Sequence, residues 1–443
     1  MTAFPIRASA AAQQTAAIWV IGVVCVQIAC QLALLSQTLA PFRVLFRSAA
    51  FSISLLAIVA VSGRANRHPA RFAAMAILAI VGFGFVHPQT ASALAAIAQL
   101  VLYTAIIGPI FWVPRLAVNR QTLVRLFTVF WSFHVLSSIF GVLQIYYPGQ
   151  FQPNISDNVI TQGELSKGLQ ITLANGESVW RPMGLTDSPG GAGMAGLYAF
   201  VFGMGFLAIG ERWTMRIAGM GGMVVGLFCI YLSQIRSIFL LTIIIAITFA
   251  AILAALRRYS AVSRLGIAVP VIGVAVFLWA SAVGGAGMVK RLETLIEADP
   301  GQVYYSNRGV FLEDTFTSFL PENPLGCGLG RWGMTANYFG NANDPTAPGI
   351  WVEIQWTAWV ADGGLLLLVA YPFAILMAMV TVGRIAIRSR EPWLSGWAIL
   401  ILAYDTAAVA LTFNYPLFIG QFGLEFWLLN GAIYAAKRTT GSK

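Results

Sequence analysis

The sequence has little charge, few histidines and few cysteines, and each scarcity excludes a class of protein. Only 10% of the 443 residues are charged, which leaves few side chains to cluster around a metal ion. The 4 cysteines are too few for a disulfide-rich secreted fold, and only Cys327 lies outside an apolar stretch. We therefore predict no metal site, no cofactor and no disulfide between loops. Three widely separated histidines are interpreted as packed or solvated residues: His68, His87 and His134.

Long apolar segments are what the sequence has in abundance. Hydrophobic residues make up 58% of the chain, and its mean hydropathy is +0.76, as is typical of integral membrane proteins. About twelve segments are long enough to cross a bilayer, and the first is long for a signal-peptide core, so we expect a retained helix. The sequence predicts an all-α integral membrane protein with a single polytopic domain over residues 1–443. The segments are approximately 16–37, 44–63, 72–86, 91–113, 124–147, 189–209, 217–233, 238–256, 265–283, 351–382, 392–413 and 418–436.

Basic residues alternate between the gaps that separate these segments. Most of the 27 Lys and Arg residues cluster in every second gap, so by the positive-inside rule these gaps and both termini face the cytoplasm. The net charge of +10 then follows from topology. Because no RNA- or DNA-binding pattern accompanies it, we predict no nucleic-acid partner. The clustered residues are Arg7, Arg64, Arg67, Arg71, Arg115, Arg120, Arg125, Arg212, Arg216, Arg257, Arg258, Arg264, Arg384, Arg388, Arg390, Lys437, Arg438 and Lys443.

Two of the outward-facing loops are too long to be simple connections. They span about residues 148–188 and 284–350. In the second loop a short amphipathic helix is predicted to begin at a Ser306–Asn307 cap and to stop at Pro321. Its apolar residues recur at helical spacing, so we expect the helix to lie on the bilayer surface above a cavity. These apolar residues are Leu312, Phe316, Phe319 and Leu320.

The remaining basic residues lie in outward gaps, where they contribute nothing to orientation, so we expect several of them to bind an anion. Guanidinium groups match phosphate oxygens in bidentate fashion and stay charged at any relevant pH. Arg236 lies in a short polar hairpin between two spans, where a charge is costly unless it snorkels, pairs or faces a polar cavity. Arg181 is either functional or paired with Asp187 or lipid headgroups. The outward set is Arg43, Arg47, Lys167, Arg181, Arg236, Lys290, Arg291, Arg308 and Arg331.

Acidic residues inside or beside the predicted spans seldom face lipid. Glu353 follows the second long loop directly and is the best placed to face an outward cavity. It is either a general base or a partner that holds an arginine in place. Asp362 lies nine residues further along the same helix, deeper and on about the opposite face. Asp405 and Glu425 are expected to pair with outward arginines or with polar groups of other spans.

Five short motifs follow one another between about residues 180 and 382. They are Arg181-Pro182-Met183-Gly184, the hairpin Ser233-x-x-Arg236-Ser237, Asn307-Arg308-Gly309, the stretch Asn323-Pro324-Leu325-Gly326-Cys327-Gly328-Leu329-Gly330, and Asp362-Gly363-Gly364. In this order, topology and spacing the chain resembles the O-antigen ligase and O-antigen polymerase superfamily of bacterial surface polysaccharide assembly. Each motif alone is degenerate, so the resemblance depends on their order.

The resemblance implies a fold, a compartment and a substrate. It implies a GT-C-like helical bundle in the bacterial inner membrane, with the active site on the periplasmic face and glycans on undecaprenyl pyrophosphate as substrates. Arg236 and Arg308 would bind the pyrophosphate, with Arg181 as an accessory residue and Glu353 as the candidate base. Membrane lipids and a chain-length regulator are the further partners it suggests. The other candidate substrate-binding residues are Asp187, Tyr305, Asn323 and Arg331.

One departure from the family separates the alternative functions. Lipopolysaccharide ligases usually carry a histidine before the helix that corresponds to residues 351–382, whereas no outward loop after His87 contains one. This favours a polymerase that transfers a growing glycan from undecaprenyl pyrophosphate to a lipid-linked repeat unit. Because the outward loops have no cluster of metal ligands, we expect the reaction to be metal-independent. The first alternative is a ligase that transfers glycan to a lipid A core or a protein. The second is a secondary transporter or a flippase of lipid-linked oligosaccharide, although the sequence has no repeated halves.

The orientation can be tested by cysteine labelling in a variant that lacks the natural cysteines. Single cysteines at positions 160 and 340 should react with a membrane-impermeant thiol reagent in cells whose inner membrane is intact. A cysteine in place of Arg390 is the matched control and should react only after that membrane is permeabilised. The opposite pattern would reverse the orientation and move the predicted site to the cytoplasm.

Overall fold

Helices dominate the described part of the chain. The computed structural model describes residues 9–62, 67–90, 92–153, 169–293, 299–341 and 348–440. Within these residues the only strands form one antiparallel hairpin, β1 (Gln170–Thr172) with β2 (Ser178–Trp180). Nine helices of the same ranges are long and apolar enough to cross a membrane. The predicted all-α membrane protein is confirmed to this extent.

Side-chain caps fix where several helices of the first half begin. Ser9, Ser92 and Asn119 each accept a backbone N–H at the start of a helix, which satisfies one of the donors that a helix N-terminus leaves unpaired. The elements up to the first long loop are α1 (Ala10–Ala33), η1 (Ala40–Phe42), α2 (Arg43–Ala60), α3 (Arg71–Gly84), α4 (Ala93–Ile107), α5 (Pro109–Trp112), η2 (Val113–Arg115), α6 (Arg120–Tyr146) and α7 (Pro148–Phe151).

Two of the long helices that follow the first loop are broken by glycine. Gly285 in α13 has φ of 64°, and Gly364 in α18 has φ of 57°; both lie in the left-handed region that favours glycine. The break in α18 falls at the Asp362-Gly363-Gly364 motif. The long helices are α10 (Gly191–Ile209), α11 (Trp213–Ser233), α12 (Arg236–Ala255), α13 (Tyr259–Glu293), α18 (Gln355–Arg388), α19 (Pro392–Leu411) and α20 (Gln421–Thr440), and the short turn η5 (Leu417–Ile419) precedes α20.

The expected number of about twelve spans is not confirmed. Beyond the nine helices found in the described residues, α4 and the α5–η2 segment form one candidate span bent by 44°. The helix α3 has 14 residues, too few to cross a bilayer alone. The helix α20 has 20 residues but is not among the nine, and two of its polar residues, Glu425 and Asn430, are buried inside the protein.

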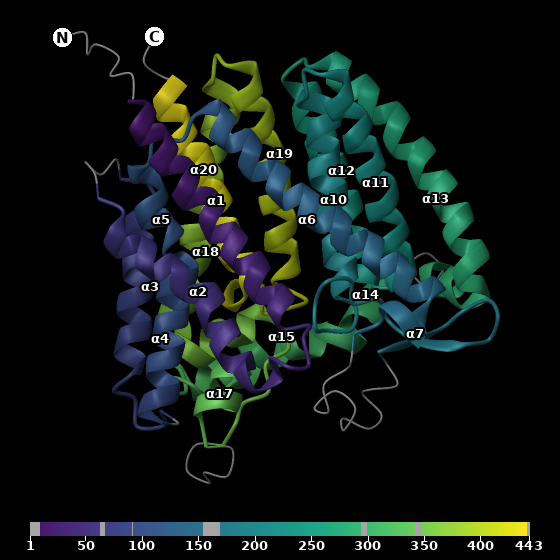
Figure 1. The fold of residues 1–443 in the computed structure, drawn as a ribbon. Helices are drawn as coiled ribbons and strands as arrows, with labels where there is room; N and C mark the ends of the chain where they lie inside the picture. The colour runs from purple at the N-terminus through teal and green to yellow at the C-terminus, as the bar shows by residue number, and fades with distance from the viewer. Residues whose placement is uncertain are drawn as a thin grey trace.

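The helices form a bundle with two distinct ends (Figure 1). The helix α1 begins and α20 ends at one end, and α14, α15 and α17 lie at the other. The helices α10 and α19 are at the centre, because 89% and 78% of their apolar windows are buried, against 11% in α13. The apolar side chains of Val271, Val274 and Leu278 on α13 are exposed, as expected of a surface that faces lipid.

Close packing between α10 and α11 depends on glycine. A Cβ atom at Gly196 would lie 2.5 Å from the carbonyl oxygen of Gly226, and one at Gly203 would lie 2.6 Å from that of Gly219. The two backbones therefore touch along four glycines. Small residues at a helix interface permit this approach in membranes, where van der Waals contact rather than water exclusion holds helices together.

The helical segment in the second long loop is longer than predicted. It starts at Pro300, where the Asp299 carboxylate accepts the Gly301 N–H at 2.9 Å, and not at a Ser306–Asn307 cap. Two π-helical turns interrupt it, and Asn307 lies inside the first of them with its amide donating to the Val303 carbonyl. The segment comprises α14 (Pro300–Tyr304), η3 (Tyr305–Gly309), α15 (Val310–Asp314), η4 (Thr315–Phe319) and α16 (Leu320–Glu322).

The glycine-rich turn after this segment is a packing element. The φ angles of Gly326, Gly328 and Gly330 are 96°, 82° and 72°. A Cβ atom at Gly328 would lie 2.5 Å from the backbone nitrogen of Thr90, so only glycine fits. Burial in this turn raises the pKa of the Cys327 thiol to about 11, which keeps it protonated. The short helix α17 (Gly333–Phe339) follows.

Candidate functional site

A cavity of about 550 Å³ lies at the end of the bundle where α12 and α20 begin. We call it the central cavity. It collects residues from parts of the chain that are far apart in sequence, including the end of the first long loop, the hairpin before α12 and the π-turn of the second loop. Its lining is Gln31, His134, Ser137, Thr186, Ser188, Pro189, Gly190, Gly191, Met194, Ala195, Tyr198, Ile235, Ser237, Ile238, Arg308, Leu411, Asn414, Tyr415, Leu417, Gly420, Gln421, Phe422 and Glu425.

Arg308 reaches this cavity from the π-helical turn η3 and is held by two partners. Its Nη1 forms an ion pair with the Glu353 carboxylate, and its Nε donates to Asn414 Oδ1 at 3.4 Å. The side chains of Arg308 and Glu353 are 33% and 21% exposed, so the charge is restrained but remains accessible. Beside it, the Tyr304 hydroxyl donates to the Phe413 carbonyl. Burial raises the pKa of Tyr304 while the Arg308 guanidinium opposes that shift, so this phenol stays neutral.

Arg181 and Arg236 are not among the lining residues of the central cavity, although both lie next to residues that are. Arg236 is the first residue of α12, and its chain neighbours Ile235 and Ser237 both line the cavity. A Cβ atom at Gly190, another lining residue, would lie 2.9 Å from Ile235 Cδ1 and 3.9 Å from Arg181 Cδ. The end of the first loop and the start of α12 are therefore in contact. Of the three predicted arginines, Arg308 is the one that lines the central cavity.

Asp187 forms an ion pair with Arg47, one of the arginines predicted to face outward. Its Oδ2 accepts from Arg47 Nη2 at 2.7 Å, and Arg47 Nη1 also donates to the Tyr338 hydroxyl at 3.1 Å. The pair therefore ties α2 and α17 to the loop segment in which Thr186 and Ser188 line the central cavity. Asp187 is thus paired with Arg47 between two lining residues of the cavity.

Three predicted substrate-binding residues are not brought to the central cavity. Arg331 is 8% exposed and donates to the carbonyls of Pro348 and Cys327 and to Gln89 Oε1. Its charge therefore holds the glycine-rich turn together. The Asn323 amide donates to the Phe319 carbonyl at the end of α16. The Tyr305 hydroxyl donates to Glu313 at 2.5 Å, which raises the pKa of this exposed phenol.

Sequence reasoning did not assign Glu425 and His134 to the site, although both line the central cavity. The Glu425 carboxylate is 2% exposed and accepts from the Tyr198 hydroxyl and, at 2.9 Å, from Gln421 Nε2. The prediction that Glu425 pairs with polar groups of other spans is confirmed. His134 stacks on Tyr198 with 4.4 Å between ring centroids. The Tyr404 hydroxyl lies 2.9 Å from that of Tyr198, so Glu425, Tyr198 and Tyr404 form a hydrogen-bonded cluster at the wall of the cavity.

Two other buried acids, Asp362 and Asp405, accept hydrogen bonds from residues of other helices and loops away from the central cavity. Asp362 accepts from Gln99, Tyr103 and Trp332 at 2.8–2.9 Å, and so joins α18 to α4 and to the residues before α17. Asp405 accepts from Asn430 at 3.0 Å. In the described ranges no group of three or more His, Cys, Asp or Glu residues is placed to hold a metal ion.

In comparisons of the sequence with protein-family models and with curated proteins, no family model and no curated protein matches the chain.

The Arg47–Asp187 contact predicts a measurable coupling between α2 and the first loop. Its side chains are 28% and 16% exposed, so reversing one charge should be destabilising, and Arg47→Asp combined with Asp187→Arg should restore stability with a coupling energy of about 1–2 kcal/mol. Thermal unfolding of the two single variants and the double variant in detergent measures it.

The Arg120–Glu211 pair is the matched control for this cycle. Its side chains are 46% and 69% exposed, and exposed ion pairs contribute little to stability. Equal coupling energies in the two cycles would contradict the assignment of Asp187 to a structured cavity rim.

Proposed function

We propose that this protein is a membrane glycosyltransferase of the polysaccharide-polymerase type, with a GT-C-like bundle and its reaction centre in the central cavity. The observation that carries the proposal is that segments far apart in the sequence meet at the central cavity. Ile235 and Ser237 of the hairpin motif, Arg308 of the Asn307-Arg308-Gly309 motif, and Thr186 and Ser188, which follow the Arg181-Pro182-Met183-Gly184 motif, all line one cavity. In the orientation expected from the basic residues, this cavity faces the periplasm.

The proposed reaction breaks the bond between the anomeric carbon of the growing glycan and a pyrophosphate oxygen. A new bond forms between that carbon and a hydroxyl oxygen of the acceptor repeat unit, the hydroxyl proton passes to a base, and undecaprenyl pyrophosphate departs. Negative charge therefore develops on the pyrophosphate. Arg308, which lines the cavity, is positioned to stabilise it, and fixed positive groups can supply this stabilisation without a metal ion. We propose Arg181 and Arg236, which lie next to lining residues, as accessory groups.

The Arg308–Glu353 ion pair changes the role that we propose for Glu353. A carboxylate engaged with Arg308 at the edge of the cavity suits a positioning residue, which holds the guanidinium toward the pyrophosphate, better than a general base. Glu425 lines the cavity itself and is the carboxylate that we propose as proton acceptor. His134, whose Nδ1 has no hydrogen-bond partner among the described residues, is the second candidate for this role.

A second candidate function follows from the cluster of titratable side chains at the wall of the central cavity. Glu425, Tyr198 and Tyr404 are joined by hydrogen bonds among the spanning helices, and His134 stacks on Tyr198. Such sets occur along proton pathways of carriers, so this observation favours a proton-coupled transporter or flippase of lipid-linked oligosaccharide. The ligase alternative differs from the polymerase only in its acceptor, a lipid A core or a protein, and the acceptor supplied in an assay distinguishes the two.

The polymerase proposal predicts how charge variants behave in liposomes supplied with a lipid-linked repeat unit as the only substrate. Arg308→Ala should lower the rate of chain extension by about a hundredfold or more, and Arg308→Lys should recover little because a point charge cannot reproduce a bidentate fork. Gel analysis of product length measures the effect, and activity should persist in EDTA.

Arg390→Ala, at an exposed arginine beside α19, is the matched control and should retain full activity.

Glu353→Gln should raise the KM for the donor, whereas Glu425→Gln should lower kcat and leave donor binding intact. Normal polymer from Arg308→Ala would contradict the proposal. Proton-dependent movement of the lipid-linked unit with no polymer from any variant would favour the carrier.

A further inference from the structure

A second cavity, of about 420 Å³, lies at the opposite end of the bundle, where α1 begins and α20 ends. It is formed by the first turns of α6 and α19 and by the turn that joins α10 to α11. We call it the basic pocket, defined by the lining residues Arg120, Arg125, Glu211, Arg212, Trp393 and Trp397. It shares no lining residue with the central cavity, and the proposed function leaves it without a role.

The charge of the basic pocket is unbalanced. Its lining carries three arginines and one glutamate. Arg120 Nη2 lies 2.5 Å from Glu211 Oε1, but the two side chains are 46% and 69% exposed, and an ion pair between exposed side chains is weak and easily exchanged. Within the described ranges, no acidic side chain pairs with Arg125 or Arg212. An anion that enters the pocket therefore meets positive charge that no acidic side chain of the described ranges neutralises.

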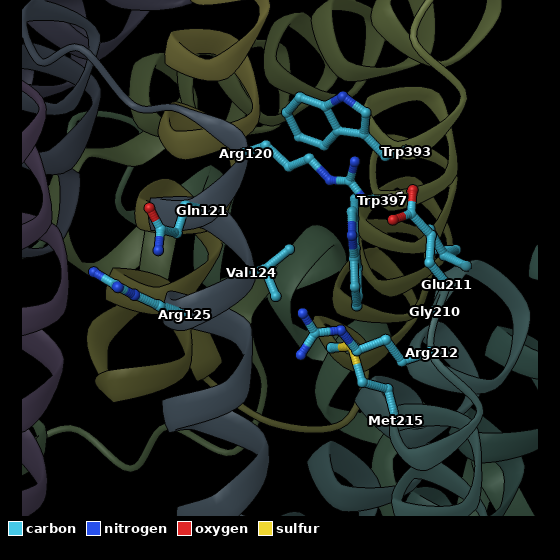
Figure 2. Close-up of a pocket in the computed structure, with 11 residues that line it drawn as sticks. Arg120, Gln121, Val124, Arg125, Gly210, Glu211, Arg212, Met215, Trp393 and Trp397 are labelled. Atoms are coloured by element: carbon cyan, nitrogen blue, oxygen red, sulfur yellow. Dashed lines mark ion pairs between the residues drawn. The ribbon is translucent and has the colours of Figure 1, made fainter.

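Two tryptophans give the basic pocket a fixed aromatic wall. Trp393 and Trp397 are 9% and 2% exposed, and the Arg120 guanidinium lies 5.9 Å from the Trp393 ring centroid. Figure 2 shows Arg120 and Arg212 extending toward Trp397 from opposite sides, whereas the guanidinium of Arg125 points away from it. Arg120 and Arg212 are thus the two groups placed to bind one ligand together.

The backbone dipoles of three helices add to the positive potential of the basic pocket. The helices α6, α11 and α19 all begin around the basic pocket, and the N-caps of α11 and α19 make no side-chain capping hydrogen bond. The N-terminus of a helix carries a positive partial charge and unpaired N–H groups that favour anions. The side chains and the helix starts therefore select for the same kind of ligand.

We propose that the basic pocket binds the phosphodiester headgroup of an anionic phospholipid, bridging α6, the α10–α11 turn and α19. The shared chemistry is a phosphate oxyanion that replaces Glu211 as the partner of Arg120 and engages Arg212. A lipid is favoured over a free anion because Trp213, which follows Arg212 at the start of α11, is 69% exposed, and an exposed tryptophan at the end of a spanning helix marks the headgroup level of a bilayer. In the expected orientation the pocket faces the cytoplasmic leaflet, where anionic lipids gather at basic clefts between helices.

Thermal unfolding of the full chain in nanodiscs tests the proposal without any assay of activity. The unfolding temperature is followed as phosphatidylglycerol replaces phosphatidylcholine, and separately as inorganic phosphate is added to pure phosphatidylcholine discs. We expect phosphatidylglycerol to stabilise the protein and phosphate to have no effect. Each arginine removed should weaken the apparent lipid affinity about fivefold, so Arg120→Gln with Arg212→Gln should weaken it about 25-fold.

The matched control removes the same charge from the same end of the bundle. Arg388→Gln with Arg390→Gln changes two exposed arginines outside the pocket and should leave the lipid response unchanged. Glu211→Gln, which frees Arg120 without removing a positive charge, should strengthen the response and keeps the test decisive if the double arginine variant does not fold. Equal losses in both double variants, an unaltered response in Glu211→Gln, or stabilisation by inorganic phosphate alone would each overturn the proposal.

Discussion

A polar side chain among spanning helices has little water to bind, so it must find its partner inside the protein. Much of this structure follows from that constraint. Asp362 gathers three donors and thereby joins α18 to α4 and to the turn before α17. Glu425 is satisfied by Tyr198 and Gln421, which places a buried carboxylate at the wall of the central cavity. The position of each buried acid therefore fixes how neighbouring helices meet.

The same constraint explains which parts of the fold could be predicted from the sequence. Long apolar segments identified the membrane protein, because helices such as α13 present apolar side chains to lipid. Apolar length is a weaker guide at α20, where Glu425 and Asn430 face inward and lower the apolar content. It is also weaker at α3, which is too short to span alone. The start of the loop helix was misplaced because Ser306 and Asn307 resemble a cap, whereas Asp299 caps the chain earlier.

Some residues of the candidate site could likewise be predicted from the sequence, and others could not. Arg308 and the hairpin before α12 could be selected because charge or polarity beside apolar segments is unusual, and both reach the central cavity. Arg331 shares that sequence signal, yet its guanidinium is used within the protein, by the carbonyls of Pro348 and Cys327. Sequence alone cannot separate these two uses, because each depends on which backbone groups lie within reach after folding. The sequence likewise does not determine which arginine pairs with Glu353, and in the folded protein its partner is Arg308.

The central claim is that three distant segments build one pyrophosphate-binding cavity around Arg308. The most direct test is an experimental structure of the protein with undecaprenyl pyrophosphate in a lipid nanodisc. The account predicts density for the two phosphates against the Arg308 guanidinium, between Ser188 and Ser237, with the Arg308–Glu353 contact retained. Phosphate density elsewhere on the protein, with the central cavity closed or filled by other side chains, would contradict it.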